Sequence, residues 1–144
     1  VGFTVAVAGS LPEGLPTAPG CVEFLGRVPD AKAFVRSCAI IPLIARGGTG
    51  VQLKTIETFE LGLPSVATIS SLRGINSRPE NCMVADEPKL FAKALIDAAQ
   101  NVRSGKLGLA DGRAFHRLQL AALDAAVAKG IAAMASGQTR QIAA

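Results

Sequence analysis

Short apolar runs alternate along this chain with longer segments in which apolar residues recur every three or four positions. The short runs are rich in Val, Ile and Leu, as buried strands are, and they predict strands at 3–8, 22–28, 39–44, 64–69 and 82–85. The longer segments predict helices at 31–38 and 51–61, a third that begins at 86–88, and a long Ala-rich helix from about 111 to 136. Strands that alternate with helices favour an α/β fold with a parallel sheet and right-handed crossovers.

Turn and capping residues mark the ends of these elements. Segments rich in proline, glycine or polar residues predict loops at residues 10–20, 70–81 and 104–108. Asp30 is a good N-cap for the helix at 31–38. Gly62 is the expected C-terminal glycine of the helix at 51–61, and Pro64 prevents that helix from continuing.

The helix at 51–61 is expected to have two different faces. Its apolar positions step by three and four residues and predict a buried stripe of Leu53, Ile56, Phe59 and Leu63. Lys54, Glu57 and Thr58 lie off that stripe and can face a cleft. The glycine-rich turn at 46–50 precedes the helix. Glycines let a backbone approach a ligand closely, and free N–H groups at a helix start suit an anion. This turn is therefore the first candidate site.

Composition narrows the function classes. The 144 residues contain no Trp or Tyr and only six Phe, so we expect a core of Val, Ile, Leu and Ala. The net charge of +4 comes from Lys and Arg spread along the chain. Without interleaved aromatic residues, a nucleic-acid surface is disfavoured. The chain has no D-x-D pair and no G-x-x-x-x-G-K-[ST] loop, and we expect no bound metal and no cofactor.

The three cysteines, Cys21, Cys38 and Cys82, are isolated from one another. Their spacing predicts neither a zinc site nor a disulfide framework, and it favours a reducing, cytoplasmic compartment. Cys38 and Cys82 are expected to act as small buried hydrophobes. No signal-peptide pattern or uninterrupted apolar run of membrane-spanning length is evident. Because the chain opens directly on a strand, we expect it to be a fragment of a longer protein.

Several motifs, in order and at matching spacings, resemble the C-terminal domain of GT-B retaining glycosyltransferases of the group called glycosyl transferases group 1. They are Val22-Glu-Phe-Leu-Gly-Arg-Val-Pro-Asp30, Pro42-Leu-Ile-Ala-Arg-Gly-Gly-Thr-Gly-Val-Gln-Leu-Lys54, and Glu57 with Leu61-Gly-Leu-Pro-Ser-Val-Ala-Thr68. The resemblance covers residues 3–96. It implies a Rossmann-like domain that binds a nucleotide diphosphate sugar, whose sugar is transferred with retention to an acceptor.

The resemblance also implies roles for individual residues. Lys54 matches the lysine that contacts the donor diphosphate, and Glu57 matches the glutamate that holds the nucleotide ribose; we take both as catalytic. Donor-binding positions are expected at Arg46, Gly48, Thr49, Gly50, Thr68, Ser70, Ser71 and Arg73. For Thr68, Ser70 and Ser71, ordinary turn-forming hydroxyls are an equal alternative.

The chain departs from the family pattern at a few places. Many members have a second Glu eight residues before the one that matches Glu57, and here that position is Thr49, which weakens the inference about sugar-ring contacts. Thr58 and Ser65 replace the usual Ala and Val. Relative to the family, the chain lacks the N-terminal acceptor domain and the first strand and helix of the donor domain. A family arginine lies in that absent part, and Arg46 or Arg73 can supply positive charge in its place.

We divide the chain into a partial Rossmann-like domain, residues 1–108, and a C-terminal helix with a fraying tail, residues 109–144. Leu120, Leu123, Val127, Ile131 and Met134 form one apolar stripe on that helix. The helix can pack on this domain, cross to the missing N-terminal domain, or pair with a second copy. A peripheral contact between the parent enzyme and a membrane is also left open. We expect the isolated chain to be inactive. The alternative function is a non-catalytic module that binds a nucleotide or sugar phosphate.

Overall fold

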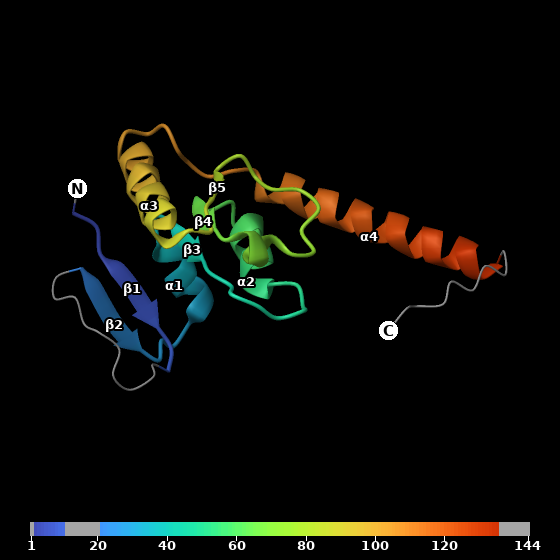
Figure 1. Cartoon of the computed structure of the whole chain (residues 1–144), viewed down its shortest axis with the longest axis horizontal. Coiled ribbons are helices and arrows are strands. Elements are labelled where there is room, and N and C mark those ends of the chain that lie inside the picture. Colours follow the sequence, from blue (N-terminus) through green and yellow to red (C-terminus); the bar gives the residue numbers. More distant parts are fainter. Residues whose placement is uncertain (1, 11–20, 136–144) are drawn as a thin grey trace.

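Five short strands and four α-helices make up the part of the chain that the computed structural model describes, residues 2–10 and 21–135 (Figure 1). The strands are β1 (Val5–Ala8), β2 (Val22–Gly26), β3 (Ile41–Leu43), β4 (Ser65–Ala67) and β5 (Cys82–Val84). The helices are α1 (Ala31–Ser37), α2 (Leu53–Glu60), α3 (Pro88–Arg103) and α4 (Gly112–Ala135), with a 3₁₀ helix η1 at Ile69–Leu72. The predicted α/β class is confirmed. Residues 11–20 of the predicted loop at 10–20, and the predicted fraying tail at 139–144, lie outside the described residues.

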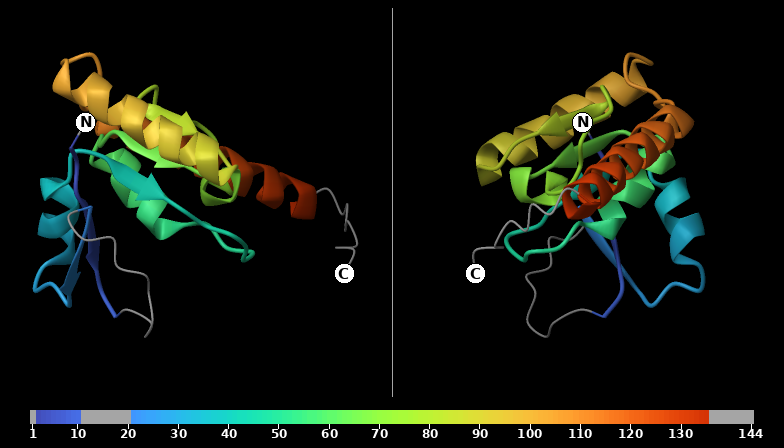
Figure 2. Two further views of the ribbon diagram at one scale, coloured as in Figure 1. Left: turned by 60° about the vertical axis from the view of Figure 1, so that its left-hand side comes forward. Right: turned by 90° about the vertical axis from the view of Figure 1, so that its right-hand side faces the viewer.

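The strands are divided between two sheets, whereas the sequence predicts one. β1 pairs with β2, and β3, β4 and β5 form a second sheet with β4 in the middle; every pairing is parallel. In Figure 2 the strands of the two sheets are splayed relative to one another. A cavity lined by residues of β1 and β3 lies between the two sheets.

The buried core lies entirely within the second sheet and its helices. One cluster contains Ile41, Leu43, Phe59 and Phe115, and another contains Val66 with Phe91, Ala94 and Ala98 of α3. The Phe59 and Phe115 rings meet edge to face, with centroids 5.2 Å apart. Among the described residues before Ile41, none is buried. The β1–β2 layer is therefore held without a core of its own.

The ends of α2 and α4 are locked together by backbone contacts. Leu63 N–H bonds Thr58 O at 3.1 Å and Gly62 N–H bonds Phe59 O at 3.0 Å, which is the Schellman pattern expected of a C-terminal glycine. Gly62 has φ of 68° and its carbonyl accepts from Ala110 N–H at 2.8 Å. Since a Cβ at Gly62 would overlap the Ala110 carbonyl oxygen, this junction requires glycine. The predicted cap at this helix end is confirmed.

α4 extends away from the body of the domain after its first turns (Figure 1). Phe115 is buried, but the apolar stripe is exposed, with Leu123 at 58% and Ile131 at 58%. Of the three alternatives for this stripe, packing on its own domain is therefore not realised among the described residues. By length and composition alone α4 is apolar enough to cross a membrane, with mean hydropathy 1.4, although one such helix is weak evidence. Asp124 and Lys129 interrupt the apolar sequence near its middle.

Candidate functional site

The loops that follow β3 and β4 are joined by two buried hydroxyl groups. Thr68 Oγ1 accepts from Ala45 N–H at 3.2 Å and lies 3.1 Å from Ala45 O and 2.8 Å from Ser71 Oγ. Ser71 Oγ donates to Leu43 O at 2.7 Å. Because these bonds connect the carboxyl ends of two adjacent parallel strands, they hold both loops at the edge where ligands of such sheets bind.

A third connection comes from Arg73, at the end of η1. Its guanidinium Nη1 donates a hydrogen bond to the carbonyl oxygen of Gly48 in the glycine turn. Gly48 has φ of 91°, in the region that favours glycine, so its carbonyl orientation depends on the absence of a side chain. Gly74 lies against Val51, the residue that leads the turn into α2. The structure thus brings Arg73 to the predicted turn.

The helix that follows the turn begins without a side-chain cap. Gln52 occupies the N-cap position and makes no side-chain capping hydrogen bond. Among the described residues, none accepts a hydrogen bond from the N–H groups of Leu53 and Lys54. Two donors therefore point out of the helix start, where the helix dipole favours negative charge.

Lys54 and Glu57 lie on α2 one turn apart. Lys54 is exposed and Glu57 is half-buried. Within the described part of the chain, neither forms an ion pair, either with the other or elsewhere. They do not form the intrahelical salt bridge that their three-residue spacing would allow. Both charged groups remain available to a ligand.

The predicted faces of α2 are partly wrong. Leu53 is 79% exposed, whereas Thr55 and Thr58 are buried with Phe59. Thr55 Oγ1 donates to Ser71 O at 2.9 Å and Thr58 Oγ1 donates to Lys54 O at 2.8 Å. Because internal acceptors satisfy these hydroxyls, Thr58 packs inward and does not face a cleft.

The remaining predicted site residues divide into two groups. Arg46, Thr49 and Gly50 are exposed in the turn, and Ser70 is half-buried in η1. Thr68 and Ser71 are buried at 9% and 1% exposure, and the bonds described above occupy their hydroxyls. Their surroundings fit the turn-forming alternative, and a direct role for either in donor binding stays a prediction.

Asp86 was not singled out from the sequence. Its Oδ1 accepts from Ile69 N–H at 2.8 Å, so the residues after β5 also anchor η1. The available signal is an aspartate two residues after the end of β5. The helix expected to begin at 86–88 starts at Pro88, where Glu87 caps the N–H of Leu90.

Other titratable groups lie away from this site. Burial raises the pKa of the Cys82 thiol. It also raises the pKa of the Cys38 thiol. Cys82 is buried as predicted, and Cys38 is half-buried. His116 is exposed on α4, with Nδ1 2.7 Å from Glu60 Oε1. In residues 2–10 and 21–135, no three His, Cys, Asp or Glu side chains gather to form a group that could hold a metal ion.

Parallel strands with crossover helices, and a glycine turn at the carboxyl end of β3, define a Rossmann-like α/β domain. The chain belongs to the family described as glycosyl transferases group 1, which matches residues 2–101. It is therefore a glycosyltransferase domain of the GT-B type. Neither the curated proteins nor the solved structures contained a match for it.

Proposed function

We propose that this domain binds a nucleoside diphosphate sugar at the glycine turn and presents it for transfer of the sugar to an acceptor. The observation that carries the proposal is the position of the turn. Counted outward from the gap between β1 and β3, β2 follows β1 on one side, and β4 and β5 follow β3 on the other. The strand order therefore reverses at this gap. Ligands of open α/β sheets bind at the carboxyl ends of the strands beside such a reversal.

The charges around the turn suit a diphosphate. Arg73 is bonded to Gly48, Arg46 lies in the turn itself, and Lys54 follows on the first turn of α2. With the two free N–H groups of α2, these cations would neutralise the oxygens of a diphosphate. Lys54 would stabilise the charge that develops on the diphosphate as the glycosidic bond breaks.

Glu57 would accept hydrogen bonds from ribose hydroxyls, as acidic side chains do in dinucleotide sites. It lies one turn further along α2 than Lys54 and has no ion-pair partner among the described residues. The acceptor and any acid–base groups would come from the other domain of the parent enzyme. We therefore propose that residues 1–144 bind donor but do not transfer sugar. From the resemblance to retaining glycosyltransferases, we also propose that the parent retains the anomeric configuration.

Lys54→Ala and Glu57→Ala, made in the parent enzyme, test this function. Each should lower kcat/KM for the donor by about ten- to a thousandfold if the side chain contacts the donor. Lys89→Ala and Glu80→Ala, which remove exposed charges elsewhere, are the matched controls and should leave kcat/KM unchanged. Full transfer by both site variants would refute the assignment. The anomer of the product, read by NMR, tests retention separately.

A binding experiment on residues 1–144 tests the donor site without catalysis. UDP or GDP at a hundred times its dissociation constant should stabilise the fold by about 2.7 kcal/mol. Lys54→Ala should reduce that shift, and Lys89→Ala should not. A shift that survives in Lys54→Ala would place the nucleotide elsewhere on the chain.

A further inference from the structure

The exposed apolar stripe on α4 is a surface feature that the donor site does not use. We propose that it is the contact face of an antiparallel pair formed by two copies of this chain, α4 against α4. The inference rests on the exposure, spacing and charges of α4. It does not depend on which ligand binds the glycine turn.

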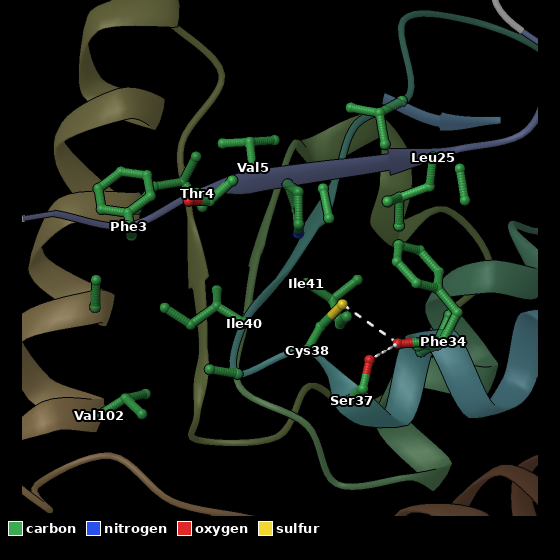
Figure 3. A pocket seen from close by; sticks show the side chains of 18 of the residues that line it. Phe3, Thr4, Val5, Leu25, Phe34, Ser37, Cys38, Ile40, Ile41 and Val102 are labelled. Carbon is green, nitrogen blue, oxygen red and sulfur yellow. Dashed lines mark hydrogen bonds between the residues drawn. The ribbon is translucent and has the colours of Figure 1, made fainter. Parts of the chain in front are cut away.

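The stripe is accessible along its whole length in the described structure. It consists of five side chains that are between 47% and 76% exposed, Leu120, Leu123, Val127, Ile131 and Met134. They lie beyond the turns in which Phe115 packs on Phe59, on the part of α4 that extends away from the domain (Figure 1). The cavity between the two sheets is a separate feature, because none of the residues that line it comes from α4 (Figure 3). The stripe therefore has room for a partner helix.

The spacing of the stripe is that of a seam between two helices. Its residues follow one another in steps of three, four, four and three, which average 3.5 residues per step. At this period apolar side chains stay in line along a pair of coiled helices. Most other positions from Leu118 to Ala135 are alanine, whose small side chain lets two helices approach closely. The face therefore suits a second helix of the same kind.

The exposed area of the stripe matches what a weak pair needs. It amounts to on the order of 600 Å² in each copy, the lower end of what each partner buries in a stable protein interface. An interface of this size supports a dissociation constant of about 10–100 µM. At lower protein concentrations the chain is mainly monomeric. Substitutions on the stripe then change association and leave the free energy of unfolding of the monomer nearly unchanged.

The charges of α4 select the antiparallel arrangement. Arg113, His116 and Arg117 lie in its first two turns, whereas its last described turn has no basic residue. Asp111 is 3.8 Å from Arg117 and Glu60 contacts His116, but Arg113 forms no ion pair with the described residues. A parallel pair would bring these basic side chains of both copies together, and like charges repel. An antiparallel pair places them beside the carboxyl end of the partner helix, where the helix dipole is negative.

A lipid surface is the competing occupant of an apolar helix face, and Asp124 argues against it. Helices that lie on membranes carry Lys and Arg along their polar face. From Leu118 to Ala135 the charged residues of α4 are Asp124 and Lys129 alone. Asp124 is four residues from Leu120 and three from Val127, so it borders the stripe. A carboxylate at this position is costly in lipid, whereas at the rim of a helix pair it stays in water.

Sedimentation equilibrium of residues 1–144 tests the pairing. The protein concentration runs from about 1 to 300 µM, which brackets the expected dissociation constant. We expect monomer at the low end, dimer at the high end and no larger species, because a two-fold contact is closed. A chain that stays monomeric throughout would leave the stripe to another partner and overturn the proposal.

Two matched variants test which face of α4 makes the contact. Leu123 and Leu118 are 58% and 56% exposed, and a separation of five residues places them about 140° apart around the helix. Leu123→Asp should weaken association at least about tenfold, because a symmetric interface contains each substitution twice. Leu118→Asp should leave association unchanged, and far-UV circular dichroism should show the same helix content in both variants. Equal weakening by the two variants would overturn the proposal.

Disulfide capture tests the direction of the pair. Leu120→Cys and Met134→Cys are introduced separately into a chain that carries Cys21→Ser, which removes the exposed native thiol. In an antiparallel pair centred on Val127, position 120 of one copy lies near position 134 of the other. Oxidation of a mixture of the two variants should therefore give mainly the mixed disulfide, identified by mass spectrometry. Disulfides formed mainly between identical positions would show a parallel pair and overturn the proposal.

Vesicles of phosphatidylcholine and phosphatidylserine test the competing occupant. We expect residues 1–144 to sediment with these vesicles no more than Leu123→Asp does. Binding that Leu123→Asp abolishes and Leu118→Asp preserves would assign the stripe to a membrane surface and overturn the proposal.

Discussion

The guanidinium of Arg73 donates a hydrogen bond to the carbonyl oxygen of Gly48, across 25 positions of sequence. Through this bond the segment after β4 holds the turn after β3. Together with the Thr68 and Ser71 bonds to Ala45 and Leu43, it makes the two loops one structural unit. The conformation of the glycine turn therefore depends on residues outside it.

Arg73→Ala should weaken binding of UDP or GDP about tenfold, close to the lower end of the energy range for hydrogen bonds to charged groups. The loss has two sources, because the variant removes a cation and releases the Gly48 carbonyl. Isothermal titration calorimetry at constant ionic strength measures it. Arg36→Ala, at an exposed position on α1, is the control. Unchanged affinity in Arg73→Ala would remove Arg73 from the site.

Thr68→Val should destabilise the fold by about 1–3 kcal/mol, because it leaves the Ala45 peptide groups without their buried partner. The substitution keeps the shape of the side chain, so the cost comes from the hydroxyl. Ser37→Ala removes an exposed hydroxyl bonded to Phe34 O and should cost less than about 0.5 kcal/mol. Urea unfolding of both variants checks the difference.

Gly62→Ala should destabilise more than Gly105→Ala, although φ is positive at both positions, 68° and 72°. Left-handed backbone at a non-glycine residue costs about 1–3 kcal/mol in either variant. At Gly62 the new Cβ would also overlap the Ala110 carbonyl, whereas nothing lies within 4 Å of a Cβ at Gly105. Thermal melting of the two variants gives the ranking, and equal losses would contradict the close contact.

Phe115→Ala and Leu123→Ala should differ sharply although both lie on α4. Phe115 is 4% exposed and packs on Phe59, so its loss should cost about 3–5 kcal/mol. Leu123 is 58% exposed, and its loss should stay within about 0.5 kcal/mol. A large loss of unfolding free energy in Leu123→Ala would mean that the apolar stripe is covered in solution, and its dependence on protein concentration would show whether a second copy covers it.

Stability should fall in alkaline solution partly through Cys82. Burial raises the pKa of this thiol above its ordinary value of 9.0, so the unfolded chain loses the proton first as the pH rises. Above pH 9.0 the unfolded state binds fewer protons than the folded one, and the free energy of unfolding drops by at most about 1.4 kcal/mol per pH unit. Urea unfolding between pH 8 and 10 should show a shallower decline for Cys82→Ala than for the Cys21→Ala control.

Much of the fold follows from local sequence signals. Asp30 caps α1 through a 2.9 Å bond to Ala33 N–H, and Gly62 ends α2, both as capping rules predict. The elements are shorter than the apolar runs suggested, since apolar residues such as Ile44 continue past the last strand pairing. A hydrophobic run predicts both burial and strand pairing, and it does not show which of its residues are paired.

The periodicity of apolar residues could not predict the tertiary contacts of these elements. Leu53 fits the apolar step of α2 but is exposed, because the buried positions nearby belong to Thr55 and Thr58, whose hydroxyls find acceptors on Ser71 and Lys54. The Arg73 bond to Gly48 joins residues with no local relationship. The motif spacing pointed to the glycine turn, but contacts of this kind depend on how the loops after β3 and β4 meet.

The distribution of buried side chains indicates which part of the described chain unfolds most easily. All the buried residues in the described part of the chain lie between Ile41 and Phe115, so the segment that holds β1, β2 and α1 contributes no fully enclosed side chain. Segments with few buried contacts open at lower free energy than the core. We therefore expect the described residues before Ile41 to open at lower free energy than the core, so that a protease would cut there while the sheet that bears the glycine turn stays folded.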